Sequence, residues 1–296
     1  MQFILVTYDI ENDRRRTKIH KLLEGYGLAV QYSVFELSNR KRTVTLPINN
    51  SHLISSLIYN IVDKSSSEYA ERLHEQGYRL ANRSFKLFTF SPLYPGNRRK
   101  WVMHENGTMS TAEALLHVTI SSPKEEFIEH LVIGLLQEPF VWIGKERFRV
   151  ETVRKLDQPE LSGEMSFIML SPLVCTTKRE PEQYPQFLYP GEQEFERVIL
   201  ENLCRKYQVL HGQPFVCESE QFGFSIDEAY VERMNGKVQK LITLKEGRSD
   251  ETKIKGTLAP FRLRAPRELM EVGYECGFGE KNSMGFGMVK VELSLS

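Results

Sequence analysis

The sequence lacks any apolar run near the ~18 residues that a membrane-spanning helix needs. The short apolar stretch at its N-terminus is followed at once by Asp9 and Glu11, without the preceding basic residues or the small-residue cleavage site of a signal peptide. These absences exclude a membrane-spanning class. We expect a cytoplasmic protein with no membrane partner.

Cysteine is scarce, with four residues that are widely separated: Cys175, Cys204, Cys217 and Cys276. No CxxC pair and no His/Cys cluster has the spacing of a zinc site. The scatter also argues against a disulfide framework. We therefore expect free, buried or half-buried thiols, no metal site and no cofactor.

An excess of charge of either sign is also missing, because Lys+Arg and Asp+Glu number 39 each. Bulk charge thus gives no sign of a nucleic-acid partner, and any basic surface must be local. Hydrophobic residues make up 41% of the 296 residues, which is ordinary for a folded protein. The length suggests about two domains.

The first 42 residues have the pattern of a strand, a helix and a strand. The apolar run Phe3 to Tyr8 predicts a strand, and Arg14 to Glu24 carries apolar residues at helical spacing. Gly25-Tyr26-Gly27 ends that helix. Leu28 to Leu37 predicts a second strand, and a polar, basic junction follows it.

A β-α-β-β-α-β series follows this junction, and it is then repeated. In the first copy we expect strands at 43–46, 85–90, 115–120 and 147–155, with helices at 52–63 and 124–137 and a short helix around 71–74. In the second copy we expect strands at 165–176, 222–226, 239–244, 253–264 and 288–293, with helices at 192–207 and 266–275.

Ser91-Pro92-Leu93 and Ser171-Pro172-Leu173 each follow an apolar strand, which favours two similar domains. The fold class is α+β, with two tandem ferredoxin-like domains at 42–160 and 161–296. A partial β-α-β unit at 1–41 precedes them.

The segment near the C-terminus holds Gly277-Phe278-Gly279 and Gly285-Phe286-Gly287, with Lys281, Asn282 and Ser283 between them. Glycine lets a backbone approach a ligand closely, and successive N–H groups can bind an anion. The spacing fits neither a Walker loop nor a dinucleotide fingerprint. We expect these seven positions, namely the four glycines and Lys281, Asn282 and Ser283, to hold an RNA backbone. A hairpin turn is the plainer alternative.

This glycine loop and its surroundings, Val272 to Val291, resemble the RAMP superfamily of CRISPR-associated RNA-processing proteins. The resemblance is greatest to the endoribonucleases that cut precursor CRISPR RNA within each repeat, family six of the Cas proteins, and it extends over 42–296. It implies two ferredoxin-like domains and CRISPR repeat RNA as partner. RAMP proteins that bind RNA without cutting share the loop, so a non-cleaving repeat-RNA binding subunit remains the alternative.

RNA is cut at its own 2′-OH when a base, an acid and a cation surround the phosphate, and His, Tyr and Lys can supply all three without metal. In the family resembled here, the catalytic residues lie in contexts that match Leu57-Ile58-Tyr59-Asn60, Leu73-His74-Glu75 and Lys86-Leu87-Phe88-Thr89. The resemblance implies acid–base roles for Tyr59 and His74, in either order, and charge stabilisation by Lys86. The products would be 2′,3′-cyclic phosphate and 5′-OH ends. The long stretch 76–85 departs from the family pattern, and His52 is a reserve candidate.

Basic residues for RNA binding are sought on strands, where alternation places Arg262 and Arg264 on one face. A solvated strand face is the alternative. Further basic candidates, with a tryptophan that could stack on a base, are Arg98, Arg99, Lys100, Trp101, Lys253, Lys255 and Arg267.

Residues 1–37 resemble a second family, the small CRISPR adaptation protein, family two of the Cas proteins. Tyr8-Asp9-Ile10, Leu23 to Gly27 and Val30 to Glu36 carry this resemblance, which covers only half of that fold. Asp9 would correspond to its metal-associated acid, but half a domain is not expected to act on DNA. We expect residues 1–41 to be dispensable for RNA cleavage. Pairing of two copies and entry into an effector complex stay open.

Overall fold

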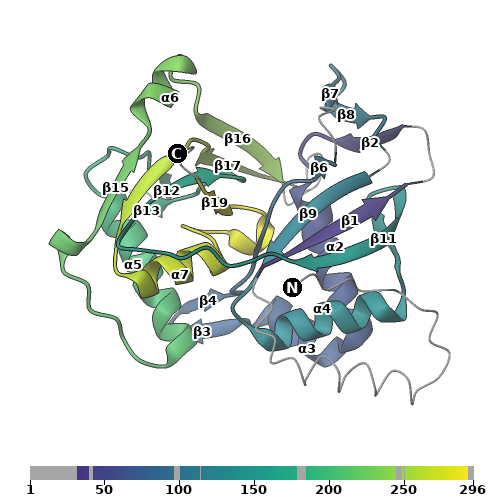
Figure 1. Cartoon of the computed structure of the whole chain (residues 1–296), viewed down its shortest axis with the longest axis horizontal. Helices are drawn as coiled ribbons and strands as arrows, with labels where there is room; N and C mark the ends of the chain where they lie inside the picture. The colour runs from purple at the N-terminus through teal and green to yellow at the C-terminus, as the bar shows by residue number, and fades with distance from the viewer. Residues whose placement is uncertain are drawn as a thin grey trace.

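The structure is a computed structural model that describes residues 32–39, 43–96, 101–113, 115–178, 185–244, 249 and 251–292. Two α+β domains lie side by side, and the loop around residues 277–287 lies at the junction between them (Figure 1). Some of the expected features fall outside the described residues. They are the strand and the helix expected before residue 28, the acidic residue Asp9, and the basic residues Arg98 to Lys100. None of the described helices is long and apolar enough to cross a membrane.

The first domain is ferredoxin-like. Its core elements in chain order are β1 (Tyr32–Ser38), α2 (Ser51–Ser65), β5 (Thr89–Phe90), β9 (Leu115–Ser121), α4 (Glu125–Gln137) and β11 (Glu146–Lys155). The antiparallel sheet runs β10-β11-β1-β9-β5, with β10 (Phe140–Ile143) at one edge and β6 (Tyr94–Pro95) paired with β9. The apolar faces of α2 and α4 pack with one face of this sheet in a single core.

The first strand of this sheet is not the one that we expected from the sequence. β2 (Val44–Pro47), the expected strand, pairs instead with β8 (Thr108–Thr111) and β7 (Val102–Met103) in a separate small sheet. β1 occupies the central position because it pairs with β9 on one side and β11 on the other. Its alternating residues Phe35 and Leu37, 3% and 1% exposed, belong to the helix-covered core. Residues 32–38, assigned to the N-terminal fragment, thus lie within the first sheet.

Two helices and a hairpin follow β2. α2 buries Ile54, Leu57, Ile58 and others along one face, as its apolar spacing predicts. Ser66 then caps α3 (Ser67–Glu75) by accepting a hydrogen bond from the Tyr69 amide. This is the expected short helix. The hairpin is formed by β3 (Tyr78–Leu80) and β4 (Arg83–Phe85).

The second domain repeats this topology. Its core elements are β12 (Glu164–Met169), α5 (Phe195–His211), β15 (Gly223–Ile226), β18 (Phe261–Arg264), α7 (Arg267–Cys276) and β19 (Val289–Val291). The sheet runs β15-β18-β12-β19, the counterpart of β5-β9-β1-β11. The remaining elements are β13 (Thr176–Thr177), β14 (Gln186–Phe187), η1 (Ser219–Gln221), α6 (Glu228–Arg233), β16 (Gln239–Leu244), β17 (Thr252–Thr257) and η2 (Asn282–Met284).

Two strands expected as single runs are interrupted. The run 165–176 separates into β12 and β13 around Pro172, and 253–264 into β17 and β18 around Pro260. Proline has no N–H for the ladder, which accounts for both breaks. β17 pairs with β16 in a hairpin outside the main sheet.

The repeated Ser-Pro-Leu does not mark equivalent positions. The first copy follows β5, the second core strand of its domain, whereas the other follows β12, the first core strand. The similarity of the two domains therefore rests on the shared strand order of their main sheets.

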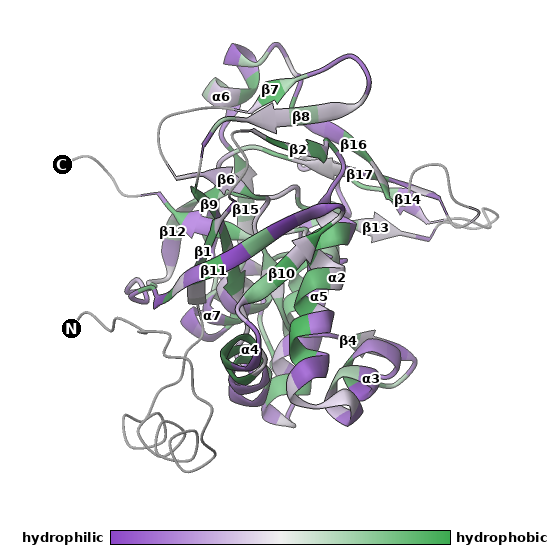
Figure 2. Ribbon diagram, turned by 90° about the vertical axis from the view of Figure 1, so that its right-hand side faces the viewer, coloured by the Kyte–Doolittle hydropathy of each residue, from purple (hydrophilic) through white to green (hydrophobic). Residues whose placement is uncertain are grey.

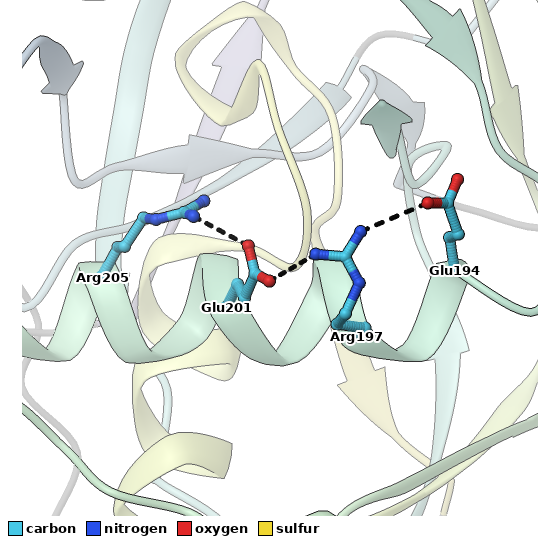
Figure 3. A network of polar contacts seen from close by, with 4 residues as sticks. All are labelled: Glu194, Arg197, Glu201 and Arg205. Carbon is cyan, nitrogen blue, oxygen red and sulfur yellow. Dashed lines mark hydrogen bonds and ion pairs between the residues drawn. The ribbon is translucent and has the colours of Figure 1, made fainter. Parts of the chain in front are cut away.

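Hydropathy follows this architecture. The exposed residues of β11 and α3 make these elements largely hydrophilic (Figure 2), and their few buried residues face the first core. Along the outer side of α5, Glu194, Arg197, Glu201 and Arg205 form a row of ion pairs with N–O distances of 3.4, 2.5 and 2.7 Å (Figure 3). Pairs of this kind on the surface contribute little to stability, because water screens the charges.

Candidate active site

Tyr59 and His74 come together at the meeting point of two helices. Tyr59 projects from α2 and is half-buried, and His74 is the exposed penultimate residue of α3. Their ring centroids are 5.1 Å apart with an interplanar angle of 83°. The Phe88 ring packs against the other side of Tyr59 at 5.8 Å. The phenol is therefore held in place, whereas the imidazole remains open to solvent.

Lys86 returns to His74 although twelve positions separate them. The long stretch between them forms the β3–β4 hairpin, in which Tyr78 lies opposite Phe85. The extra residues therefore form the arms of the hairpin, and the chain enters and leaves it at the same place. Lys86 Nζ donates a hydrogen bond to the His74 carbonyl oxygen at 2.6 Å. Burial lowers the pKa of Lys86, and the nearby Arg79 lowers it further. The departure from the family spacing thus leaves all three groups in one cluster.

The glycine loop touches this cluster directly. Ser55 Oγ of α2 donates to the Ser283 carbonyl oxygen at 2.9 Å, one helical turn before Tyr59. Burial raises the pKa of Tyr59 to about 12, an effect that the Ser283 side chain partly opposes. Residues more than 200 positions apart in the sequence therefore share one site at the domain junction.

The four glycines are required by packing inside the protein. Gly277, Gly279, Gly285 and Gly287 all have positive φ values, between 69° and 85°. A Cβ at Gly279 would lie 2.3 Å from the Val174 carbonyl oxygen, and one at Gly287 would lie 1.9 Å from that of Phe278. The space that we expected RNA to approach is filled by neighbouring chain at these positions. The reason for glycine here is thus a tight internal turn.

The polar residues of the loop divide into two groups. Asn282 Nδ2 donates to the carbonyl oxygens of Phe278 and Phe286 at 3.1 and 3.0 Å, so this side chain is engaged within the loop. Lys281 is exposed and Ser283 is half-exposed. Of the seven loop positions, Lys281 and Ser283 thus have side chains placed to meet a ligand.

The two strand arginines lie on the outer face of the second sheet. Arg262 and Arg264 alternate with buried residues of β18, as expected. Arg262 Nη1 lies 3.5 Å from Glu164 Oε1, and both side chains are more than half exposed. Lys253 and Lys255 are likewise exposed, on β17.

Other candidates have structural surroundings. Trp101 Nε1 donates to the Leu93 carbonyl oxygen at 3.0 Å and packs against the first core. His52 is the second residue of α2 and is half-buried. All four cysteines are free, as expected. Among the described residues, no cluster of three or more His, Cys, Asp or Glu could hold a metal ion.

One residue near the site was missed in the sequence. Lys206 of α5 is 2% exposed and contacts the glycine loop. Its signal was present, because Ile199, Leu203 and Lys206 follow the helical spacing of a buried face. A lysine on an apolar helix face requires a partner.

Two ferredoxin-like domains, joined through a C-terminal glycine loop, define a protein of the RAMP class. A model for "CRISPR associated protein Cas6, C-terminal" matches residues 156–291, and one for "CRISPR-associated protein Cas6, N-terminal" matches 45–154. The chain is 32% identical to a CRISPR-associated endoribonuclease Cas6 of Methanocaldococcus jannaschii, over 86% of this chain and 90% of that protein. The chain belongs to the Cas6 family.

Two further likenesses agree with this assignment. The Cas6 endoribonuclease of Pyrococcus furiosus is 32% identical over 86% of both chains. A solved structure described as "An RAMP protein binding different RNA substrates" superposes with a TM-score of 0.71 at 25% identity, covering 89% of this chain and all of that one.

The N-terminus matches a second family, as the sequence indicated. A model for "CRISPR associated protein Cas2" matches residues 1–67, which extends past the expected limit at residue 37. The match overlaps β1, β2 and α2 of the first domain. Residues 32–39 and 43–67 therefore fit a Cas2-like sequence pattern and also form part of the first domain.

Proposed function

We propose that this protein is an endoribonuclease that cuts precursor CRISPR RNA within its repeats, without a metal ion. The relatives from Methanocaldococcus jannaschii and Pyrococcus furiosus are both named endoribonucleases. The observation that carries the proposal is the meeting of Tyr59, His74 and Lys86 with the glycine loop, which contacts α2 through Ser283. It supplies a proton acceptor, a proton donor and a cation at one place.

The geometry favours different roles for the two ring residues. With a pKa raised to about 12, Tyr59 keeps its proton at neutral pH and is suited to donate it. His74, exposed beside it, would accept the proton of the RNA 2′-OH. The 2′ oxygen then attacks the phosphorus, the bond to the 5′ oxygen breaks, and Tyr59 protonates that oxygen. The products are a 2′,3′-cyclic phosphate and a 5′-OH end.

Charge around the phosphate comes from lysines. Lys86 has two ammonium protons left after its bond to the His74 carbonyl, and these would stabilise the developing negative charge. Lys281 on the exposed loop, with Arg262 and Arg264 on the second sheet, would bind phosphates farther along the RNA.

A cleavage assay with end-labelled repeat RNA tests this function. We expect one site-specific cut per repeat, 5′-OH and cyclic phosphate ends, and an unchanged rate in EDTA. Loss of cleavage on chelation, restored by added Mg²⁺ or Mn²⁺, would contradict the metal-free mechanism. Tight binding of intact RNA with no cutting would instead favour the non-cleaving subunit.

The role of Tyr59 predicts a particular pH dependence. Its raised pKa means that the phenol is protonated throughout pH 5–9, so its ionisation adds nothing to the rate profile in that range. Tyr59→Phe should lower the single-turnover rate by about 10²-fold or more, by the same factor at each pH. A deficit that changes severalfold between pH 5 and pH 9 would show that Tyr59 titrates during the reaction, as a base would.

A further inference from the structure

Lys206 carries a buried ammonium group that lies beneath the glycine loop. Its Nζ donates to the carbonyl oxygens of Gly277 at 2.6 Å and Gly279 at 2.8 Å, and to Asn282 Oδ1 at 2.8 Å. An ammonium has three protons, and these three acceptors use them all. Burying such a charge is costly unless it is fully hydrogen-bonded. The arrangement therefore requires the loop to keep its observed shape.

The acceptors lie at points that define the loop. Gly277 and Gly279 form its entry, and Asn282 joins its two halves by donating to Phe278 and Phe286. The Phe278 amide also donates to the Gly287 carbonyl oxygen at 2.8 Å. Lys206 and Asn282 thus cross-link the entry, the turn and the exit of the loop.

The residue after Asn282 is the one that meets the first domain. Ser283 accepts a hydrogen bond from Ser55 Oγ of α2 through its carbonyl oxygen at 2.9 Å, and Ser55 lies one helical turn before Tyr59. A continuous set of contacts therefore runs from Lys206 in α5 through Asn282 and Ser283 to α2 beside Tyr59. It crosses from the second domain to the first.

We propose that Lys206 is a positioning residue for RNA cleavage, which fixes the glycine loop so that Ser283 stays bound to Ser55 of α2, one helical turn from Tyr59. The proposal rests on the proposed endoribonuclease function. Burial lowers the pKa of Lys206 to about 8, opposed by Cys276 and Glu280. The ammonium is therefore still the main form at neutral pH.

Lys206→Met keeps the length and apolar stem of the side chain but removes its three donors. Because small misplacements of reacting groups are costly, we expect the single-turnover rate to fall about 10–100-fold. The Kd for repeat RNA should change less than about threefold, since Lys206 itself is out of reach of the RNA. Arg205→Met is the matched control, because it removes the neighbouring cation of α5, whose only role shown is an exposed ion pair with Glu201 (Figure 3).

A double-mutant cycle distinguishes positioning from general stability. If Lys206 acts through the contact between Ser283 and Ser55, the Ser55→Ala variant should lose part of the same rate, because it removes the hydrogen bond to the Ser283 carbonyl oxygen. Adding Lys206→Met to it should then give much less than the product of the two losses. Independent effects that multiply would overturn the proposal. So would a Kd that rises as much as the rate falls.

Hydrogen exchange of residues 277–288 gives a readout that needs no activity. Exchange there should become faster in Lys206→Met and stay unchanged in Arg205→Met. If Lys206→Met does not fold, judged by circular dichroism, Lys206→Gln retains two donors and should show the same changes to a smaller degree. Unchanged exchange and rate in a folded variant would overturn the proposal. Absence of cleavage by the unaltered protein would overturn the proposed function instead.

Discussion

His74→Ala is expected to lower the single-turnover rate of repeat-RNA cleavage by about 10²–10⁴-fold, the usual contribution of one acid–base group. The imidazole is exposed and lies edge-on to the Tyr59 ring at 5.1 Å, so it is free to meet the RNA backbone. Binding should be largely retained, because the residues that we propose to bind phosphates are Lys281, Arg262 and Arg264. Single-turnover kinetics and a filter-binding titration measure the two quantities separately.

His104→Ala is the matched control for this variant. His104 is an exposed histidine of the same domain whose Nε2 lies 2.8 Å from Ser110 Oγ, at the edge of the small sheet. We expect its rate to equal that of the unaltered protein. A His74→Ala variant that cuts at the full rate would remove His74 from the mechanism and make His52, at the start of α2, the next residue to test.

The fold class could be predicted because it depends on local patterns. The apolar stripes of α2, α4 and α5 have helical spacing, and most strands are bounded by polar or proline residues. The error at the first strand has a different origin. Residues 32–38 and 43–46 both read as strands, and only their pairing partners decide which one joins the main sheet. The local sequence of either segment does not predict such long-range pairing.

The site shows the same division. Tyr59, His74 and Lys86 were proposed from short motifs, but the motifs could not reveal that residues 78–85 form a hairpin. The glycines were proposed from their spacing, but the spacing could not reveal that atoms of Val174, Phe90 and the loop itself leave no room for a Cβ there. Buried contacts between distant residues decide such questions, as they do for Lys206.

Because β1 belongs to the first sheet, we expect residues 32–38 to be needed for cleavage, contrary to the expectation that residues 1–41 are dispensable. A chain that begins at residue 42 lacks the central strand of the first sheet, together with the buried side chains of Phe35 and Leu37. Each of these side chains contributes about 1.5–3 kcal/mol by burial. The two strand pairings are lost as well, and typical domains are stable by only about 5–15 kcal/mol. We expect the first domain to unfold and cleavage to disappear.

A chain that begins at residue 31 is the matched comparison, because it keeps β1 whole. We expect it to show a cooperative thermal transition and to cut repeat RNA. The chain from residue 42 should show neither the thermal transition of the first domain nor RNA cleavage. Equal stability and activity of the two would mean that another segment can replace β1 between β9 and β11. If instead both chains fail, residues 1–30 are needed too, and the Cas2-like match over 1–67 would describe a segment on which the Cas6 fold depends. The pair of truncations thus shows which part of the N-terminal segment the first domain needs to fold and to cut RNA.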